Sequence, residues 1–397
     1  MKDLFELFIS NLNNLNFQFK RYLAEKIDWS SRLTAVTGAR GVGKTVMMLQ
    51  HIRDSYEINE KVLYASLDNI YFSANTLGDM ADIFVKNGGE ILFLDEVHKY
   101  PDWSIEIKNL YDNYPNLKIV FSGSSILNIN KGYADLSRRA VSFLMQGMSF
   151  REYLLLEKEF DFPVVSLDDI LNNHLDISKN ICREIKPIAE FKNYLKYGYY
   201  PYYRESKDMY HQKLMSTLNV IIESDLPSVH SVEYKNINKL KKLIYVISSS
   251  VPFKANVTKL AERIGVSRNT IIMFFDFLEQ AQIINYVNTP QKGLGYLTKP
   301  EKIYMNNTNQ MFALSKEAVN KGNLRETFFL NQISAVHTVH LPEKGDFLAD
   351  GQFTFEIGGK NKTNSQIKGI PDSYIAMDDI EFGYKNTIPL WLFGFLY

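Results

Sequence analysis

Short apolar runs alternate with helix-like stretches over the first 150 residues of the chain. In order, these segments are LTAVTG, a helix from Gly43, KVLYASLD, a helix around Leu77 to Lys86, ILFLDE and KIVFSGSS. Such alternation is typical of a parallel sheet with helices on both of its faces. The pattern therefore predicts an α/β domain over residues 1–150.

Beyond this domain the pattern changes again. Residues 151–235 are mostly helical, with stretches such as HQKLMSTLNVIIESDL, and predict a helical subdomain. Over residues 236–310, two helical stretches joined at IGVS precede an alternating segment around Gly293 and Gly295, which predicts a winged helix. Residues 311–397 begin helical and turn to strands at FLADGQFTFEIGG. We therefore expect four parts in the chain.

The first strand-like run leads into a glycine-rich turn, GARGVGKT, which fits the phosphate-binding pattern GxxxxGK(S/T). A chain of this length would contain such a string by chance roughly once in a hundred sequences. The glycines let the backbone turn closely around phosphate groups, while the amides at the helix N-terminus point at the anion. Lys44 would pair with the β- and γ-phosphates, and the Thr45 hydroxyl would bind Mg²⁺. The predicted nucleotide-binding residues are Gly38, Ala39, Arg40, Gly41, Val42, Gly43, Lys44 and Thr45.

Fifty residues after Thr45, the run ILFLDE ends in the acidic pair Asp95 and Glu96. Four apolar residues followed by two acids are expected at the carboxyl end of a buried strand. There Asp95 would hold the Mg²⁺ ion and Glu96 would polarise the attacking water. Taken alone, the pair fits a solvated strand end equally well. The glycine-rich turn upstream favours the catalytic interpretation.

Three further residues are candidates for the same phosphate. KIVFSGSS ends in polar residues, of which Ser122 is the first candidate for contact with the γ-phosphate or the water; a plain strand-to-loop turn is the alternative. Arg138 and Arg139 in ADLSRRAVSF could stabilise charge on the transferring phosphoryl group as arginine fingers. A finger acting in trans needs an oligomer, and solvated or structural arginines fit the sequence as well.

Composition limits the partners and the compartment. The 397 residues carry 45 Lys and Arg against 45 Asp and Glu, so no overall charge draws the chain to nucleic acid or to an anionic membrane. Cys182 is the only cysteine, which excludes an intrachain disulfide and a cysteine-cluster zinc site and fits a reducing compartment. Polar residues interrupt the N-terminal apolar runs. We therefore predict a cytoplasmic protein without a membrane partner.

Together the motifs resemble the prokaryotic, often called archaeal-type, AAA P-loop ATPases that carry a C-terminal region of unknown function. The matching pieces are FKRYLAEKIDWSSRLTAVTGARGVGKT, VLYASLDNIYF, ILFLDEVHKYPDWSIEIKNLYDNYPNLKIVFSGSS, ADLSRRA, MSFREYL, GYYPYY, the helix-turn-helix and EIGGKNK. The resemblance implies an AAA-type core, a helical lid, a winged helix and a C-terminal α/β domain similar to restriction-endonuclease folds. It also implies ATP and Mg²⁺ as cofactors. It brings no established biological role.

The region 236–310 is locally basic, with ten Lys and Arg against four acids. Such an excess is expected of a module that binds nucleic acid. The apolar helix body IIMFFDFLEQ instead suits packing between neighbours and leaves few side chains to read a groove. DNA and a protein are therefore both retained as partners. The candidate DNA contacts are Ser267, Arg268, Asn269 and Thr270 at the start of the second helix, and Lys292 in the wing.

A second set of polar residues near the end of the chain fits a nuclease-like site. Restriction-like nucleases hold Mg²⁺ and activate water with a helix glutamate, an aspartate at a strand start, and a strand acid followed by a lysine. The usual acid-x-Lys spacing is broken here, because Gly358 stands where the lysine is expected. We therefore expect a nuclease-like scaffold without cleavage. The candidate residues are Glu326, Asp346, Glu356 and Lys360, with Asp350 and Lys362 as alternatives.

The sequence thus predicts a Mg²⁺-dependent P-loop ATPase in which the γ-phosphate controls the lid and the C-terminal domains. One hypothesis is an ATP-powered or ATP-gated protein that acts on DNA. The alternative is a nucleotide-controlled signalling ATPase whose winged helix and terminal domain bind a protein. A homo-oligomer is compatible with both.

Overall fold

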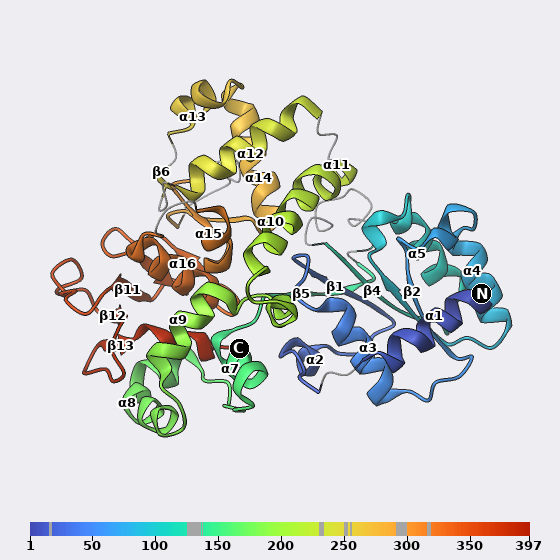
Figure 1. Ribbon diagram of the computed structural model, residues 1–397, viewed down its shortest axis with the longest axis horizontal. Helices are drawn as coiled ribbons and strands as arrows, with labels where there is room; N and C mark the ends of the chain where they lie inside the picture. The colour runs from blue at the N-terminus through green and yellow to red at the C-terminus, as the bar shows by residue number, and fades with distance from the viewer. Residues whose placement is uncertain are drawn as a thin grey trace. The chain divides into compact units, whose positions relative to one another are not determined.

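Figure 1 shows the computed structural model of the chain. The chain forms two compact units. Unit 1 consists of Met1–Gln146 and Val220–Glu233, and unit 2 of Gly147–Asn219 and Tyr234–Tyr397. The chain therefore enters unit 2, returns to unit 1 for one short segment, and leaves it again. The structure describes residues 1–15, 18–124, 136, 138–229, 234–249, 253–254, 256–290, 300–315 and 319–397.

Unit 1 is built on a five-stranded sheet whose strand pairs are all parallel, in the order β2-β3-β4-β1-β5. Four of the strands coincide with the four predicted apolar runs and are almost completely buried. β5 is not among the predicted runs, because it is an edge strand that exposes Val141 and Leu144. The strands are β1 (Leu33–Gly38), β2 (Val62–Ser66), β3 (Ile91–Asp95), β4 (Lys118–Ser124) and β5 (Val141–Met145).

Helices cover both faces of this sheet, with α1 packed beside α3 and α4 beside α5 (Figure 1). α4 forms because its apolar residues recur at helical spacing and because Thr76 accepts a hydrogen bond from the N–H of Asp79 at 3.0 Å. The predicted α/β class is confirmed. The helices are α1 (Lys2–Asn13), α2 (Leu23–Lys26), α3 (Lys44–Ser55), α4 (Leu77–Lys86) and α5 (Trp103–Asn113), with 3₁₀ turns at Ile70–Ser73 and Val97–Lys99.

A short helical segment from the middle of the chain completes unit 1. α10 (Tyr210–Val220) continues directly into a π-helical turn (Ile221–Asp225) and α11 (Leu226–Val229). We call residues 220–229 the return segment, because they bring the chain from unit 2 back to unit 1. π-Helical turns occur frequently at functional sites. The π-helical turn therefore makes the return segment a candidate part of a functional site.

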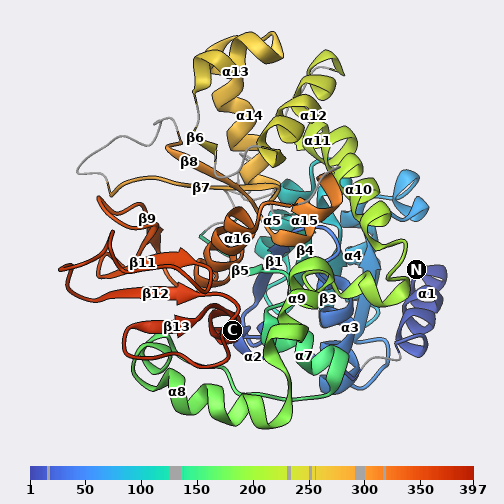
Figure 2. The same cartoon turned by 60° about the vertical axis from the view of Figure 1, so that its left-hand side comes forward.

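Unit 2 combines helices with two sheets, and Figure 2 shows its larger sheet in red and orange. The smaller sheet is antiparallel, with the order β6-β8-β7. The larger has the order β13-β12-β11-β10-β9 and mixes parallel with antiparallel pairs. The strands are β6 (Phe253–Lys254), β7 (Ile284–Val287), β8 (Lys302–Met305), β9 (Val339–His340), β10 (Phe347–Ala349), β11 (Phe353–Gly358), β12 (Ser373–Met377) and β13 (Thr387–Pro389).

The remaining helices belong to unit 2, and no helix in the described part of the chain is long and apolar enough to cross a membrane. They are α7 (Phe150–Lys158), α8 (Leu167–Glu184), α9 (Pro187–Tyr197), α12 (Tyr234–Ser248), α13 (Val257–Ile264), α14 (Arg268–Gln280), α15 (Thr308–Leu314) and α16 (Lys321–Ile333), with 3₁₀ segments at Pro201–Glu205 and Leu390–Phe395.

α13 and α14 follow one another as a helix-turn-helix would. Gly265 ends α13 with a φ of 76°, in the left-handed region that favours glycine. Ser267 caps α14 by accepting a hydrogen bond from the N–H of Thr270 at 3.1 Å. β7 and β8 then pair in antiparallel fashion, and residues 291–299 between them lie outside the described residues. The winged helix and the four-part division remain predictions.

Candidate nucleotide site and candidate sites of unit 2

The turn GARGVGKT lies between the carboxyl end of β1 and the first turn of α3. Gly41 and Gly43 have φ values of 84° and 102°, which only glycine adopts without strain. Gly38 is needed for a different reason, because a Cβ there would lie 2.5 Å from the carbonyl oxygen of Met145 on β5. The glycines therefore serve the backbone turn at two positions and strand packing at the third.

The ammonium group of Lys44 is buried inside this turn. Its Nζ donates to the carbonyl oxygens of Gly38 at 2.9 Å and Ala39 at 3.0 Å. Burial lowers the pKa of Lys44, and the nearby carboxylates of Glu96 and Asp95 oppose this change. A desolvated cation of this kind is a favourable partner for phosphate oxygens.

Asp95, at the end of β3, connects the turn to the neighbouring strands. Its Oδ2 accepts hydrogen bonds from the Thr45 hydroxyl at 2.6 Å and from the Tyr64 hydroxyl at 2.7 Å. Its Oδ1 accepts from the Ser122 hydroxyl and, at 3.1 Å, from the N–H of Glu96. Because β3 lies between β2 and β4, one carboxylate receives donors from both adjacent strands. The structure thus brings together three residues predicted from separate motifs, and adds Tyr64.

Glu96 follows β3 in an uncommon backbone conformation, with φ 52° and ψ 38°. Left-handed conformations of non-glycine residues are strained and gather at functional sites. Burial raises the pKa of Glu96, while the positive charge of Lys44 opposes this shift. The Glu96 Oε2 lies 3.4 Å from Nε2 of His98. This acid is therefore partly desolvated and placed by the chain between a lysine and a histidine.

Asp225 of the return segment joins the site, although no motif predicted it. Its side chain is 1% exposed and forms an ion pair with Lys99 and a second with Arg40, whose Nη1 lies 3.6 Å from Oδ2. His98 Nε2 lies 4.0 Å from Asp225 Oδ1. Since Arg40 belongs to the glycine-rich turn, the return segment contacts the predicted phosphate-binding loop directly.

A signal for Asp225 does exist in the sequence. In HQKLMSTLNVIIESDL the apolar residues that become buried recur at helical spacing, and Asp225 occupies the next position of the same stripe. An acid on a buried stripe needs a partner, because an isolated buried charge is costly. The buried residues of the stripe are Leu214, Leu218, Ile221, Ile222 and Asp225.

Arg21 is a second residue that the motifs did not indicate. It is 4% exposed and donates from Nη2 to the carbonyl oxygen of Gln146 at 2.8 Å. Its Nη1 donates to the carbonyl oxygen of Val42 in the glycine-rich turn. Arg21 therefore ties the loop to the residue that follows β5.

The two candidate finger arginines differ in their surroundings. Arg139 donates from Nε and Nη2 to the two carboxylate oxygens of Asp112, each at 3.0 Å. Arg138 is exposed. A role for Arg139 at a phosphoryl group would require this bidentate pair to break.

Comparison with known protein families finds an AAA domain in the chain. Residues 30–154 match the family model of an AAA domain. An AAA domain implies ATP binding and hydrolysis by the matched region. Residues 188–317 match a domain of unknown function. The match to the AAA domain covers the glycine-rich turn, Asp95, Glu96 and Ser122.

Two relatives found by sequence are described as uncharacterized proteins. A protein of Methanocaldococcus jannaschii is 31% identical over 296 residues, which span 69% of this chain and 62% of that protein. A protein of Haemophilus influenzae is 23% identical over 391 residues, covering 89% of this chain and 91% of its own length. The chain thus spans less than two thirds of the archaeal relative.

The solved structures found have low overall similarity. AMPPCP-bound DnaA from Aquifex aeolicus is 13% identical, with 69% of this chain and 86% of that chain covered and a TM-score of 0.24. A katanin structure is 15% identical, with coverage of 39% and 60% and a TM-score of 0.25.

In unit 2 the structure brings the predicted acids together. Glu326 on α16 accepts a hydrogen bond from the Tyr304 hydroxyl at 2.8 Å, and Asp346 accepts from the N–H of Ile357 at 2.8 Å. Burial raises the pKa of Glu326 and of Glu356, and the charge of Asp346 raises both further. These three carboxyl groups therefore share one electrostatic environment.

The lysine beside these acids is the alternative one. Lys362 forms an ion pair with the fully buried Glu356, whereas Lys360 is exposed. A Cβ at Gly358 would lie 2.3 Å from Cγ of Lys362, so the glycine makes room for this side chain. The alternative acid Asp350 instead contacts His337 at 2.6 Å. Within the described ranges, no group of three or more His, Cys, Asp or Glu residues has an arrangement that could hold a metal ion.

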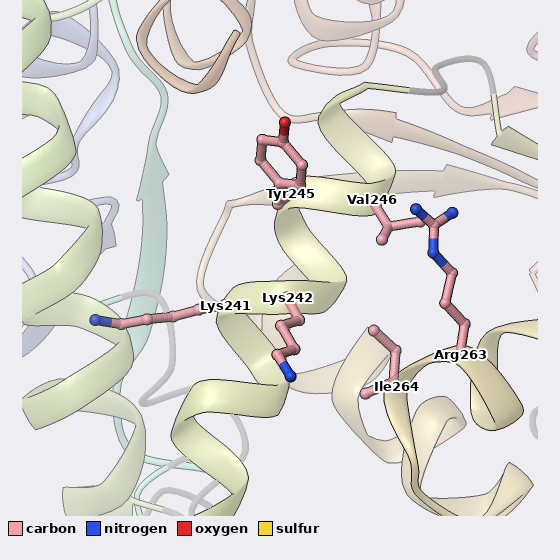
Figure 3. Close-up of a pocket in the computed structure, with 6 residues that line it drawn as sticks. All are labelled: Lys241, Lys242, Tyr245, Val246, Arg263 and Ile264. Atoms are coloured by element: carbon pink, nitrogen blue, oxygen red, sulfur yellow. The ribbon is translucent and has the colours of Figure 1, made fainter. Parts of the chain in front are cut away.

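The candidate DNA contacts form a small polar patch at the N-terminal end of α14, and the body of this helix is mostly apolar. Arg268 and Asn269 are exposed, and Ser267 and Thr270 bond to one another in the cap at 2.8 Å. Lys292 lies outside the described residues. A surface with more basic residues than this patch surrounds an open pocket of about 390 Å³ between α12 and α13 (Figure 3). The pocket is lined by Lys241, Lys242, Tyr245, Val246, Arg263 and Ile264.

Proposed function

We propose that this protein is a Mg²⁺-dependent ATPase whose nucleotide state controls unit 2. The observation that carries the proposal is the placement of Asp95, which joins the Thr45 hydroxyl of the loop to the Ser122 hydroxyl of β4 and to the backbone of Glu96. A buried carboxylate with donors on both sides holds each of these groups in a fixed orientation.

The donor set suits a hard cation and a polyphosphate. Mg²⁺ prefers oxygen ligands and binds proteins through few of them together with phosphate oxygens. The Thr45 hydroxyl and the Asp95 carboxylate would hold the ion, and Lys44 with the amides of the turn would bind the phosphates. Bound Mg²⁺ would neutralise charge on the transferring phosphoryl group.

Glu96 would orient the attacking water. Its carboxylate follows the strand that ends at Asp95 and lies close enough to Lys44 for their charges to interact. In this role a carboxylate accepts a hydrogen bond from water and points an oxygen lone pair of that water at phosphorus. Ser122 is the candidate for contact with the γ-phosphate.

Control of unit 2 would act through Asp225. Arg40 of the turn and Asp225 of the return segment form an ion pair. Phosphate at the turn would compete with Asp225 for the Arg40 guanidinium, because arginine binds both anions well. Since the return segment continues α10 of unit 2, this competition gives a physical route for nucleotide control.

Two variants test the ATPase proposal. Lys44→Ala should abolish tight binding of ATP, and Glu96→Gln should keep ATP binding but lose hydrolysis, measured by equilibrium binding and by phosphate release. Glu57→Gln, on the exposed surface of unit 1, serves as the control and should change neither. Normal nucleotide affinity in Lys44→Ala, or undiminished turnover in Glu96→Gln, would reject the assigned roles.

A second function, binding of a nucleic-acid backbone, is favoured by the charge on α12 and α13. These helices carry six Lys and Arg and one acid, Glu262. Lys242 on α12 and Arg263 on α13 are exposed and border the same pocket (Figure 3). α14, in contrast, buries Ile271, Phe274, Phe275 and Leu278. We propose that phosphates bind along α12 and α13, with Arg268 as a lesser contact.

Salt dependence tests this second function. Each phosphate contact contributes about 0.9 to the slope of log K against log salt concentration. The double substitution Lys242→Ala with Arg263→Ala should therefore reduce the slope for duplex DNA by about two. The matched control removes two exposed charges from α8, Lys179→Ala with Arg183→Ala, and should leave the slope unchanged. Absence of salt-sensitive DNA binding by the wild type would favour a protein partner.

The acid cluster of unit 2 supports a scaffold better than a nuclease. The Lys362 ammonium group already pairs with Glu356, which leaves this carboxylate compensated inside the protein. We therefore propose that unit 2 does not cleave DNA. Metal-dependent nicking that disappears in Glu356→Ala would overturn this proposal.

A further inference from the structure

His98 lies beside Glu96, and one of its ring nitrogens already accepts a hydrogen bond. The N–H of Ser124, at the end of β4, donates to Nδ1 of His98 at 3.4 Å. A neutral imidazole carries its proton on only one nitrogen. The bond from Ser124 therefore requires the proton of His98 to be on Nε2.

The Nε2–H group has no hydrogen-bond partner within the described part of the chain, although the side chain of His98 is only 2% exposed. Leaving a buried donor unsatisfied is costly, so such a group in a native protein calls for an explanation. Two carboxylates lie nearby: Oε2 of Glu96 at 3.4 Å and Oδ1 of Asp225 at 4.0 Å.

Of these two acids, Asp225 is already compensated by cations. Lys99 and Arg40 both form ion pairs with it. Glu96 has no such cation in direct contact among the described ion pairs, and its Oε2 is the closer oxygen. A small rotation of the Glu96 side chain would bring this oxygen within hydrogen-bond distance of His98, because 3.4 Å exceeds the usual 2.7–3.2 Å by little.

We infer that His98 is a positioning residue for the hydrolysis of ATP, whose Nε2–H fixes the carboxylate of Glu96 in the orientation that directs water at the γ-phosphate. This inference rests on the proposed function. Burial lowers the pKa of His98 to about 4, so the ring is neutral at physiological pH. It therefore orients Glu96 as a neutral hydrogen-bond donor. The link to Ser124 also ties this orientation to the strand that carries Ser122.

Two substitutions at His98 distinguish the roles of its two ring nitrogens, Nε2 and Nδ1. Gln places an amide donor close to the position of Nε2, whereas Asn reaches only the position of Nδ1. We expect His98→Asn to lower kcat by about 10- to 100-fold with little change in the affinity for ATP, since misplacement of a catalytic group by about 1 Å has effects of this size. His98→Gln should retain most of the wild-type kcat.

The Gln and Asn variants distinguish positioning from space filling. If His98 only fills space, both should be impaired to a similar degree, and that result, or a wild-type kcat in His98→Asn, would overturn the inference. The double variant Glu96→Gln with His98→Asn should be no slower than Glu96→Gln alone, because the donor acts through Glu96. Undiminished hydrolysis by Glu96→Gln alone would instead reject the proposed function.

A measurement on the wild type keeps the inference testable if a variant does not fold. Nitrogen-15 NMR of the histidine rings reports which ring nitrogen carries the proton. We expect the His98 signals to show protonation at Nε2, with assignment through the bonds that connect the ring to the backbone of the wild-type protein. A ring protonated at Nδ1 would contradict the inference.

Discussion

At the scale of single residues, a few buried side chains hold the predicted nucleotide site in place. Asp95 is 2% exposed and accepts hydrogen bonds from three hydroxyl groups and one backbone amide. Each donor belongs to a different segment, so the carboxylate orders the loop, β2 and β4 together.

His51 provides a residue-scale prediction about pH. It lies on α3, stacks on Trp29 with ring centroids 3.8 Å apart, and has its pKa lowered to about 4 by burial and by the charge of Lys118. The unfolded chain binds a proton at this residue near pH 6.5, whereas the folded chain does so only near pH 4. Stability contributed by His51 is therefore present above pH 6.5 and is lost as the pH falls toward 4.

We expect this loss of stability to be roughly 1–2 kcal/mol between pH 7 and pH 4, less than the full pKa shift implies, because His51 is only part-buried and solvent screens its charge. The measurement is the free energy of unfolding of the wild type and of His51→Gln at a series of pH values. The variant should be less stable at pH 7, because it loses the stacking on Trp29, but should lose less stability on acidification. Parallel pH profiles for the two proteins would show that His51 does not titrate in this way.

At the scale of elements, the return segment depends on one buried acid. Asp225→Asn would remove the charge that compensates Lys99 and Arg40. We expect a loss of about 1–3 kcal/mol in the free energy of unfolding, measured by denaturant titration, because a buried ion pair would lose one partner while the cations still reach solvent. Asp208→Asn, the same substitution at an exposed position just before α10, is the control and should change stability by less than about 0.5 kcal/mol. Equal losses would refute the argument.

The same elements show how far the sequence alone predicts the structure. β1 to β4 and α4 follow from local apolar patterns, and the meeting of Thr45, Asp95 and Ser122 follows because parallel strands end at one edge of a sheet. β5 is not apparent, since half-exposed edge strands lack a continuous apolar run.

Contacts between segments that are distant in the chain are harder to predict from the sequence than local elements are. Asp225 forms an ion pair with Arg40, which lies 185 residues earlier in the chain. No local sequence pattern indicates a contact between residues so far apart in the chain. In unit 2 the sequence offers Lys360 as the first candidate and Lys362 as the alternative, and the turn after Gly358 brings Lys362 to Glu356. Strand periodicity assumes an extended chain, and it fails where glycines allow the backbone to turn back.

At the scale of the whole molecule, the central question is whether ATP at unit 1 changes unit 2. The chain passes from α10 into the return segment without a break in the helix, and Asp225 of that segment pairs with Arg40 of the glycine-rich turn. An effector can shift an equilibrium only through contacts that differ between the two states. In the proposed function the Arg40–Asp225 pair would be such a contact, because a bound phosphate would compete for the same guanidinium.

Hydrogen exchange can test this route in the intact protein. In Glu96→Gln with Mg²⁺ and ATP, amides of the turn and α3 should exchange more slowly, since a ligand that binds only the folded state stabilises it by about 2.7 kcal/mol at 100 times its Kd. Amides of residues 220–229 should exchange faster, because Asp225 loses Arg40. Arg40→Ala should show this faster exchange without nucleotide, and adding ATP should then have little further effect there. If residues 220–229 become protected together with α3, phosphate does not compete for Arg40, and control of unit 2 must use another contact.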